Sequence, residues 1–451
     1  CFIGVRKNSL WTIRHKEEQM NGQELISRMR RLGDVHSIKE VSQLSSAMFP
    51  GPHCPLMGAM MAVRGIQDSV MLVIGTDECT YYTKNTTIGN QAFGGLDGRC
   101  LSVVLDQHDV TFGCREKLYE AFQEMMEEYK PKAVFVVTTC VVEVIGDDVD
   151  SMVEELRIQY NVYAMAIHTE HFKTENHLPG VRDTITACFD MMEPQSDNGS
   201  VNVIGQRMGD FSTTELYRIL TDAGVPIGMM LPSGTTVDEI RHAPAARVNL
   251  VVNPIGLPLA QKMQEAFGTA YVLFDKYIDP DHIYELYQEL FRYLNLPLPE
   301  SVETLYAQAK TAMSGASGQL KGLRYIYGNT PIDCFEYNAF MVKLGMIPLL
   351  IQTNEIPEET DENLQVILKH WNPYVTKTAN IAPLQYVYDV LHPNLYLGHE
   401  FAMRLREKGI EMVHSDMLSP MLGLEVSIAG ITELLRAGSA ARLLQERRER
   451  A

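Results

Sequence analysis

Short β-branched runs alternate with amphipathic stretches along this chain, and the alternation limits what it can fold into. Four early runs have the composition of buried strands: SVMLVIG (69–75), LSVVLD (101–106), AVFVVTT (133–139) and NVYAMAI (161–167). The segments between them include CREKLYEAFQEMMEEYK and DDVDSMVEELRIQY, which carry apolar residues at helical spacing. This alternation predicts a parallel, doubly wound α/β sheet.

The same pattern begins again twice further along the chain. SVNVIG (200–205) follows a polar stretch, and LRYIYG (323–328) follows MSGASGQLKG. Because 451 residues are too many for one hydrophobic core, we predict three α/β domains with parallel sheets. The expected segments are an N-terminal arm (1–39), three domains (40–195, 196–316 and 317–437) and a charged C-terminal tail (438–451).

Composition argues against several classes of protein. The formal net charge is −18, so the surface repels phosphate backbones and anionic lipids, and neither nucleic acid nor a membrane is an expected partner. No apolar run approaches the roughly 20 residues of a membrane span, and the N-terminal apolar stretch is too short for a signal peptide. The eight widely spaced cysteines do not resemble a secreted disulfide framework. We therefore expect a cytoplasmic protein.

Three cysteines stand where a predicted strand or loop leads into a helix. Cys54 precedes the apolar stretch PLMGAMMAVRG, Cys79 follows soon after SVMLVIG, and Cys140 directly follows AVFVVTT. Ligands of open α/β sheets collect beyond the carboxyl ends of the strands, and a helix N-terminus favours the thiolate that ligates metals. Gly58 and Gly75 are expected to let the backbone approach a bulky inorganic cluster. The alternative for each cysteine alone is a buried, inert thiol.

Three thiolates are one short of the four that a [4Fe–4S] cube needs. If these cysteines bind a cluster, a group outside the set must complete the site, and a subunit interface would supply one. Among the other cysteines, Cys100 and Cys188 are interpreted as structural, because they start a strand and lie in a helical pattern. Cys114 and Cys334 are lesser alternatives for a cluster or substrate role.

The stretch AIHTEHFKTENHLPG is a second candidate site. Its imidazoles, at His168, His171 and His177, have Glu170 and Glu175 beside them. Such a group could bind metal, shuttle protons or supply a further cluster ligand. The alternative is a polar loop whose histidines bond backbone groups.

These motifs resemble component 1 of nitrogenase and its relatives, namely the molybdenum–iron protein subunits, the scaffold proteins for their cofactor, and the dark-operative protochlorophyllide reductase subunits. The matching stretches are CPLMGA, IGTDEC, DVTFGCREKL and TTCVVEVIGDDVD. The resemblance implies three Rossmann-like domains and an iron–sulfur cluster, [4Fe–4S] or larger and P-cluster-like, shared with a partner subunit. Its implied ligands are Cys54, Cys79 and Cys140. His171 stands near the place of a cluster-contacting hydroxyl residue in the family and is a further candidate metal ligand.

The resemblance also implies partners: a homologous component 1 subunit, in a heterodimer or an α2β2 heterotetramer, and an ATP-dependent iron protein as electron donor. In the family's catalytic subunit, a Cys in the middle domain and a His near the C-terminus hold a second metal cofactor. Here Asn253 and Leu422 stand at those places, and His414 lies outside the motif.

The implied function is therefore that of an oxidoreductase subunit that does not itself reduce the substrate. It would relay electrons through an interfacial iron–sulfur cluster to an active site on a partner subunit. The alternatives are a scaffold protein for the assembly of a nitrogenase-type metal cofactor and a subunit of a tetrapyrrole reductase. The sequence does not identify catalytic residues or a substrate.

Overall fold

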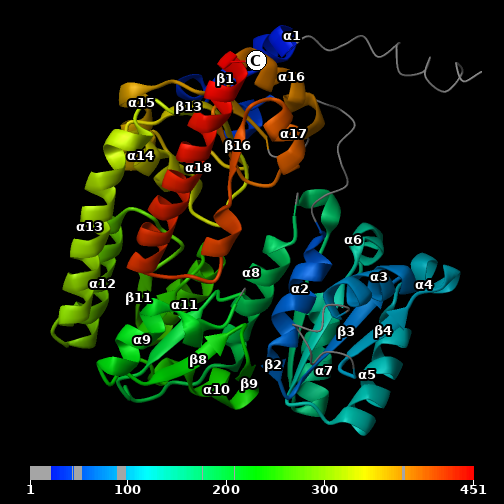
Figure 1. Ribbon diagram of the computed structural model, residues 1–451. Helices are drawn as coiled ribbons and strands as arrows, with labels where there is room; N and C mark the ends of the chain where they lie inside the picture. Colours follow the sequence, from blue (N-terminus) through cyan, green and yellow to red (C-terminus); the bar gives the residue numbers. More distant parts are fainter. Residues whose placement is uncertain are drawn as a thin grey trace, which may run out of the picture. The chain divides into compact units, whose positions relative to one another are not determined.

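The computed structural model describes residues 22–42, 44, 53–88, 98–174, 176–207, 209–377 and 381–450. The chain divides into two compact units, each built on parallel strands and helices (Figure 1). Unit 1 consists of the described residues within 1–51, 277–282 and 304–451, and unit 2 of those within 52–276 and 283–303. Within these ranges, no helix has the length and apolar character that a membrane span requires.

Unit 2 contains a first four-stranded parallel sheet in the order β4-β3-β5-β6. Because β3 has β4 on one side and β5 on the other, the strand order reverses between β3 and β5. In open α/β sheets, this reversal leaves a crevice at the carboxyl ends of the two central strands. The strands are β3 (Ser69–Gly75), β4 (Cys100–Val104), β5 (Ala133–Thr138) and β6 (Tyr163–Ile167).

Helices cover both faces of this sheet, which explains why β3 and β5 are buried at every residue. Met71 and Val73 of β3 pack with α2 and α8 on one face, whereas Leu72 packs with α5 and α7 on the other. The helices of this part are α2 (Pro55–Arg64), α3 (Asp77–Ile88), α4 (Gln107–Phe112), α5 (Arg115–Tyr129), α6 (Cys140–Ile145), α7 (Val149–Tyr160) and α8 (Leu178–Ala187).

A second parallel sheet of unit 2 has the order β11-β10-β7-β8. Its core is continuous with one face of the first sheet, and the short strands β2 and β9 pair in parallel between them. The strands are β2 (Ile66–Gln67), β7 (Val201–Ile204), β8 (Ile227–Leu231), β9 (Thr235–Thr236), β10 (Val248–Val251) and β11 (Ala270–Leu273). The helices are α9 (Glu215–Asp222), α10 (Val237–His242) and α11 (Leu257–Phe267).

Unit 1 is built on a six-stranded sheet in the order β1-β14-β13-β12-β15-β16. The edge strand β1 pairs antiparallel with β14, and the other neighbours are parallel. The strands are β1 (Arg30–Arg31), β12 (Arg324–Tyr327), β13 (Ile347–Gln352), β14 (Tyr374–Thr376), β15 (Leu395–Leu397) and β16 (Glu411–Val413). The helices are α1 (Gly22–Arg28), α14 (Cys334–Lys343), α15 (Glu362–His370), α16 (Ile381–Leu391), α17 (Ala402–Glu407) and α18 (Leu424–Arg450). Two long helices, α12 (Pro280–Leu294) and α13 (Glu300–Leu320), contribute to both units.

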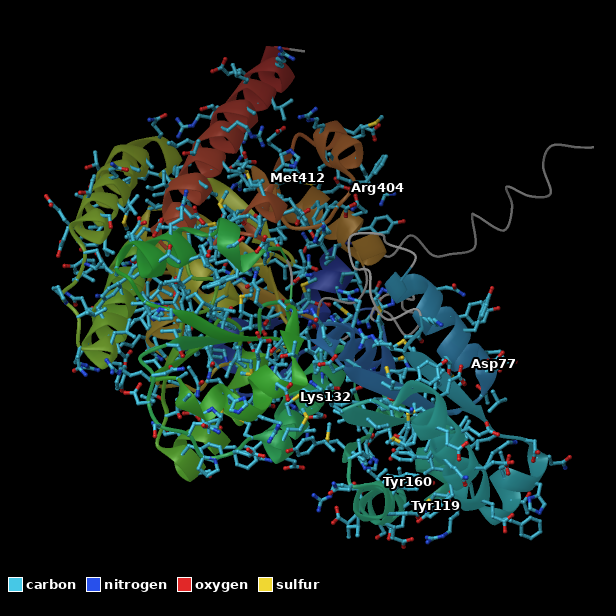
Figure 2. All side chains as sticks on the ribbon, turned by 90° about the horizontal axis from the view of Figure 1, so that it is seen from below. Asp77, Tyr119, Lys132, Tyr160, Arg404 and Met412 are labelled. Atoms are coloured by element: carbon cyan, nitrogen blue, oxygen red, sulfur yellow. The ribbon has the colours of Figure 1, made fainter. Side chains whose placement is uncertain are left out.

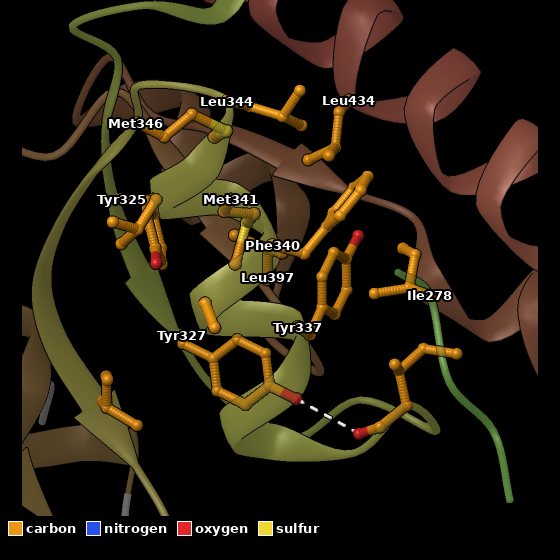
Figure 3. Close-up of a cluster of buried hydrophobic side chains, with 14 of the residues drawn as sticks. Ile278, Tyr325, Tyr327, Tyr337, Phe340, Met341, Leu344, Met346, Leu397 and Leu434 are labelled. Atoms are coloured by element: carbon orange, nitrogen blue, oxygen red, sulfur yellow. Dashed lines mark hydrogen bonds between the residues drawn. The ribbon is translucent and has the colours of Figure 1, made fainter. Parts of the chain in front are cut away.

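The core of unit 1 is aromatic as well as aliphatic (Figure 3). Tyr325 and Tyr327 of β12 are buried, and each hydroxyl has a partner: Tyr325 donates to Oδ1 of Asn338 at 2.9 Å, and Tyr327 donates to the carbonyl of Ile332 at 3.4 Å. Such partners are needed because a buried polar group left without one costs about 1–3 kcal/mol. Tyr325 and Tyr327 therefore fill the core with their hydroxyl groups paired, whereas the buried hydroxyl of Tyr337 has no hydrogen-bond partner among the described residues.

The predicted α/β class with doubly wound parallel sheets is confirmed, and the antiparallel β1 is an addition at one edge. Each predicted domain segment contains one of the larger sheets, and α13 runs through the expected limit between residues 316 and 317. The division into three domains stays a prediction. Of the predicted N-terminal arm, residues 1–21 lie outside the described residues. The charged segment from residue 438 continues α18 to Arg450.

Candidate cluster-binding site

The carboxyl ends of β3 and β5 form the edge at which the candidate cysteines gather. The two strands are direct neighbours, with Ile74 opposite Thr138. Each strand leads at once into a helix, so that Cys79 is the third residue of α3 and Cys140 is the first residue of α6. Asp77, which opens α3, is labelled in Figure 2. The strand order thus places both cysteines at the topological switch point of the first sheet; we call this the cysteine edge.

Cys54 reaches the cysteine edge from a helix rather than from a strand. It is the N-cap residue of α2, which packs against β3 and β5 and leads through β2 into β3. Because the chain reverses between α2 and β3, the start of α2 lies toward the carboxyl end of β3. All three candidate ligands therefore belong to segments that begin at this edge.

Two hydrogen bonds reach the candidate sulfur atoms. The backbone N–H of His171 donates to Sγ of Cys140 at 3.3 Å, and the hydroxyl of Thr76 donates to Sγ of Cys79 at 3.6 Å. Donors of this kind stabilise negative charge on a cluster thiolate. His171 thus contacts Cys140 through its backbone, while the residue is exposed. A ligand role for its imidazole stays a prediction.

The glycines of this region approach protein atoms and not open space, which corrects the expected reason for their presence. A Cβ atom at Gly75 would collide with the side chain of Thr139, and one at Gly58 would collide with the backbone carbonyl of His177. Gly75 therefore allows the end of β3 to approach the start of α6. Gly58 allows α2 to cross α8 closely, and Gly180 does the same from α8, where a Cβ would meet the carbonyl of Pro55.

The donor set at the cysteine edge suits an iron–sulfur cluster. Of the three candidate ligands, Cys54 and Cys140 are partly buried and Cys79 is exposed. Next to Cys140, the buried hydroxyl of Thr139 has no hydrogen-bond partner among the described residues. Among all the described residues, no group of three or more His, Cys, Asp or Glu side chains is close enough to hold a single metal ion. A cluster spreads its thiolates over several irons, so the ligands need not meet at one point.

The remaining described cysteines have a different environment. Cys100, Cys114 and Cys188 are buried. Burial raises the pKa of Cys100 to about 11 and that of Cys114 to about 12. It also raises the pKa of Cys188 and of the partly buried Cys334. Because a thiolate is needed for ligation, these four thiols are poorly suited to bind metal.

A carboxylate and an imidazole support the turn that carries Cys140, and sequence reasoning did not single out this pair. Glu143 of α6 accepts a hydrogen bond from the hydroxyl of Thr138, and it contacts Nδ1 of His168 at 2.7 Å. Nε2 of His168 lies 3.2 Å from Asp150. Burial by itself lowers the pKa of His168, but hydrogen bonds and charge from Glu143 and Asp150 raise it above its ordinary value. The signal in the sequence was the acidic residue one helical turn after Cys140.

Large apolar side chains are exposed on the helices next to the cysteine edge. Phe112 of α4 is 76% exposed and Val144 of α6 is 74% exposed. Tyr81 and Tyr82 of α3 are also exposed, as is Phe172, which follows His171. All five belong to elements that follow the carboxyl ends of strands β3 to β6. We call these five residues the apolar rim.

The positions at which the family's catalytic subunit holds its second cofactor have structural roles here. The side chain of Asn253 accepts a hydrogen bond from the N–H of Ile255 at 3.3 Å and caps a short helical turn. Leu422 is fully buried. The N–H of His414 donates to Glu433 at 2.7 Å, and His414 lines a cavity of about 360 Å³ beyond β15 and β16.

Comparison with known proteins identifies the family. A sequence profile of the family described as nitrogenase component 1 type oxidoreductase matches residues 54–434. The chain therefore belongs to this family, as its motifs predicted. Members of the family carry iron–sulfur clusters and form multisubunit complexes with an iron protein.

Individual relatives come from different branches of the family. The chain is 26% identical over 328 residues to the nitrogenase iron-molybdenum cofactor biosynthesis protein NifE of Rippkaea orientalis, covering 70% of this chain and 69% of that protein. It is 28% identical to the NifE of Clostridium pasteurianum and spans 49% of each chain. It is also 26% identical to a light-independent protochlorophyllide reductase subunit of a Synechococcus species, over 36% of this chain and 35% of that one.

A solved structure supports the fold. The structure described as nitrogenase Cp1 at pH 6.5 matches with a TM-score of 0.73 at 17% identity, covering 88% of this chain and 95% of that one. At this identity the match establishes the fold and not the activity. The predicted nitrogenase component 1-like architecture is thereby confirmed.

Proposed function

We propose that Cys54, Cys79 and Cys140 bind an iron–sulfur cluster at the cysteine edge, and that a homologous partner subunit completes the site. The observation that carries this proposal is the contrast among the cysteines. Those at the cysteine edge are partly or fully accessible and lie beside the apolar rim, whereas Cys100, Cys114 and Cys188 are buried. Accessible thiols beside an exposed apolar surface suit a site that a second chain covers.

The chain's proposed role is to relay electrons within a nitrogenase-like reductase. When bound, the cluster supplies a one-electron store whose potential depends on burial and on hydrogen bonds to sulfur. The N–H of His171 and the hydroxyl of Thr76 provide two such hydrogen bonds. The apolar rim would exclude water once the partner covers it. An ATP-dependent iron protein is the proposed electron donor, and the substrate-reducing site is proposed to lie on the partner.

The test of the cluster is metal analysis after anaerobic purification of the chain with its partner. Cys54→Ala, Cys79→Ala and Cys140→Ala should each lose most of the iron and acid-labile sulfide, since each removes one thiolate ligand. Cys334→Ala is the matched control and should keep both. Full iron content in all three test variants would refute the assignment.

A second candidate function is a maturation scaffold, on which a metal cofactor is assembled and then transferred. The observation that favours it is the similarity to two proteins named for iron-molybdenum cofactor biosynthesis. A subunit of a tetrapyrrole reductase is a third candidate, supported by similarity to a protochlorophyllide reductase subunit over a shorter part of the chain.

One pair of measurements separates the first two functions. A reductase subunit, mixed with its partner, iron protein, ATP and dithionite, should support continuous oxidation of dithionite over many turnovers. A scaffold should instead release one metal cluster per complex to an apo-acceptor protein. Stoichiometric transfer without sustained dithionite oxidation would overturn the electron-relay proposal in favour of the scaffold.

A further inference from the structure

Two basic side chains follow strands of the second sheet and are partly buried. Arg207 comes after β7, and Lys276 comes after β11. Because β7, β10 and β11 are parallel, their carboxyl ends lie at one edge of the sheet. This is the edge at which open α/β sheets bind ligands. It is a different edge from the cysteine edge, which belongs to the first sheet.

The guanidinium of Arg207 is incompletely satisfied. Its Nε is buried and has no hydrogen-bond partner among the described residues. Its Nη1 lies 3.4 Å from Nε2 of His177, and no other hydrogen bond or ion pair of this side chain is present in the described part of the chain. Nε of the guanidinium therefore points its N–H at no acceptor within that part. Leaving a buried charged donor unpaired is costly, so the arrangement indicates a missing acceptor.

His177 completes one side of this group. It is the N-cap residue of α8, and the close crossing of α2 and α8 at Gly58 fixes its backbone. Burial, together with the charges of Arg207 and His53, lowers the pKa of His177 to about 4. The imidazole is therefore neutral near pH 7 and can accept from Nη1 of Arg207. The contact orients the guanidinium without adding charge.

A second cation and a carboxylate act on the charge of Arg207. Burial lowers the pKa of Lys276 to about 8, with Asp275 raising it and Arg207 lowering it further. Burial also lowers the pKa of Arg207, and Asp275 is the carboxylate that opposes this effect. Among the described residues, Asp275 is thus a carboxylate that acts on the pKa of both cations, and the neutral His177 adds no charge.

Cations elsewhere in unit 2 provide the contrast. A cavity of about 680 Å³ at the amino ends of β5 and β6 is also lined by basic side chains. Two of its lining residues, Lys132 and Tyr160, are labelled in Figure 2. There, Lys132 pairs with Asp238 at 2.6 Å, and Arg241 pairs with Glu193 at 2.9 Å. Those cations are neutralised by the protein itself, whereas Nε of Arg207 has no acceptor in the described part of the chain.

We infer that Arg207, Lys276 and His177 form a binding site for an oxoanion group, carried by a small organic acid or a phosphate compound. The chemistry that selects this class is the planar Nε and Nη2 fork of Arg207, which matches two oxygen atoms of a carboxylate or phosphate. Lys276 supplies a second positive charge. The inference does not depend on the proposed function of the cysteines.

The test is isothermal titration calorimetry of the full chain with two probes, succinate and inorganic phosphate, at pH 7. At least one probe should bind saturably. Arg207→Gln should raise its Kd about tenfold or more, because a charge-assisted bidentate contact is lost. Arg207→Lys keeps the positive charge but loses the planar pair of N–H donors, so its Kd should lie between those of the wild type and Arg207→Gln. The matched control is Arg247→Gln, which removes a cation that is already paired with Asp197 at 2.9 Å.

The outcomes separate the ligand sources and decide the proposal. Binding of succinate alone indicates an organic acid, and binding of phosphate alone indicates a phosphate compound. Circular dichroism verifies that each variant is folded, and Lys276→Met, with an expected rise in Kd, replaces Arg207→Gln if that variant does not fold. The proposal is overturned if neither probe binds saturably, or if the variants at Arg207 or Lys276 bind as tightly as the wild type.

Discussion

The two candidate sites of unit 2 lie at carboxyl ends of parallel strands but have opposite surroundings. At the cysteine edge, the functional side chains are accessible and exposed apolar residues stand beside them. At the end of the second sheet, the side chains are partly buried, and the buried Nε of Arg207 has no partner among the described residues. An accessible apolar site calls for a large covering surface, whereas a buried charged site calls for a small ligand. The same sheet geometry thus serves two kinds of binding.

The largest expected effect comes from placing a charge in the apolar rim. Val144→Glu should weaken association with the partner subunit about 30-fold or more, because central apolar contacts dominate interface energy. Sedimentation velocity of the mixed subunits measures the change. Ile158→Glu is the control, since Ile158 is exposed but lies beside the cavity at the amino ends of β5 and β6. Equal association of both variants with the partner subunit would show that the apolar rim does not contact the partner.

The crossing of α2 and α8 joins the two sites, because Cys54 caps α2 and His177 caps α8. Gly58→Ala should lower the free energy of unfolding by about 1–3 kcal/mol, since the added methyl group meets the backbone of His177. Thermal or chemical denaturation measures this loss.

Gly315→Ala provides the matched control for that substitution. Gly315 lies inside α13 and has open space around its Cα, so alanine should raise stability by about 0.5–1 kcal/mol. An unchanged stability of Gly58→Ala would show that the two helix starts are not held by this contact.

The pH dependence of oxoanion binding tests the charged site at the end of the second sheet. Lys276 loses its proton near pH 8, so affinity for the bound probe should fall about two- to fivefold between pH 7 and 9. Arg207 stays charged over this range, while His177, with a pKa of about 4, stays neutral. Calorimetry at several pH values follows the change. With succinate, whose two carboxylates stay ionised from pH 7 to 9, the slope should disappear in Lys276→Met, and a slope that persists would contradict its assignment to Lys276.

The smallest expected effect concerns His168 beside the cysteine edge. Its pKa in the folded chain is raised, so its stabilising contribution is complete below the unfolded value of about 6.5 and is lost as pH rises through the folded value. Because its side chain is 38% exposed, the loss should stay below about 1 kcal/mol. Urea denaturation at pH 6 and pH 8 should show this loss in the wild type and not in His168→Gln. His370→Gln, on α15, should keep the wild-type difference.

Long, continuously buried strands were predictable, and short ones were not. The run SVMLVIG was expected at 69–75, which is where β3 lies, because seven apolar or small residues in succession leave little ambiguity. The strands β14, β15 and β16 have three residues each, which is too few to show a period. The stretch MSGASGQLKG was interpreted as a boundary, but most of it continues α13. Gly315 and Gly318 are tolerated there because no other described part of the structure packs against them.

The two candidate sites also differ in how far the sequence could predict them. The cysteines could be singled out because each stands beside an element boundary that the local sequence already indicates. Arg207 and Lys276 could not, because they are two of 39 basic residues and meet only through the order of the strands. Strand order depends on how helices pack across the sheet, and no local pattern encodes it. His168 was a candidate from the sequence, but its pairing with Glu143 was not predictable for the same reason, since the two residues follow neighbouring parallel strands.

The way in which the two units share the chain sets an order for folding during synthesis. Nearly all of unit 2 is complete once residue 303 has left the ribosome, because its segments are 52–276 and 283–303. Unit 1 must wait, since β1 near the start of the chain pairs with β14, more than three hundred residues later. The early segment around Arg30 therefore remains unpaired while the whole of unit 2 is translated. The exposed Arg30 and Arg31 give this waiting edge strand a positive charge, which disfavours pairing with other chains. Neither unit corresponds to one continuous segment of the chain.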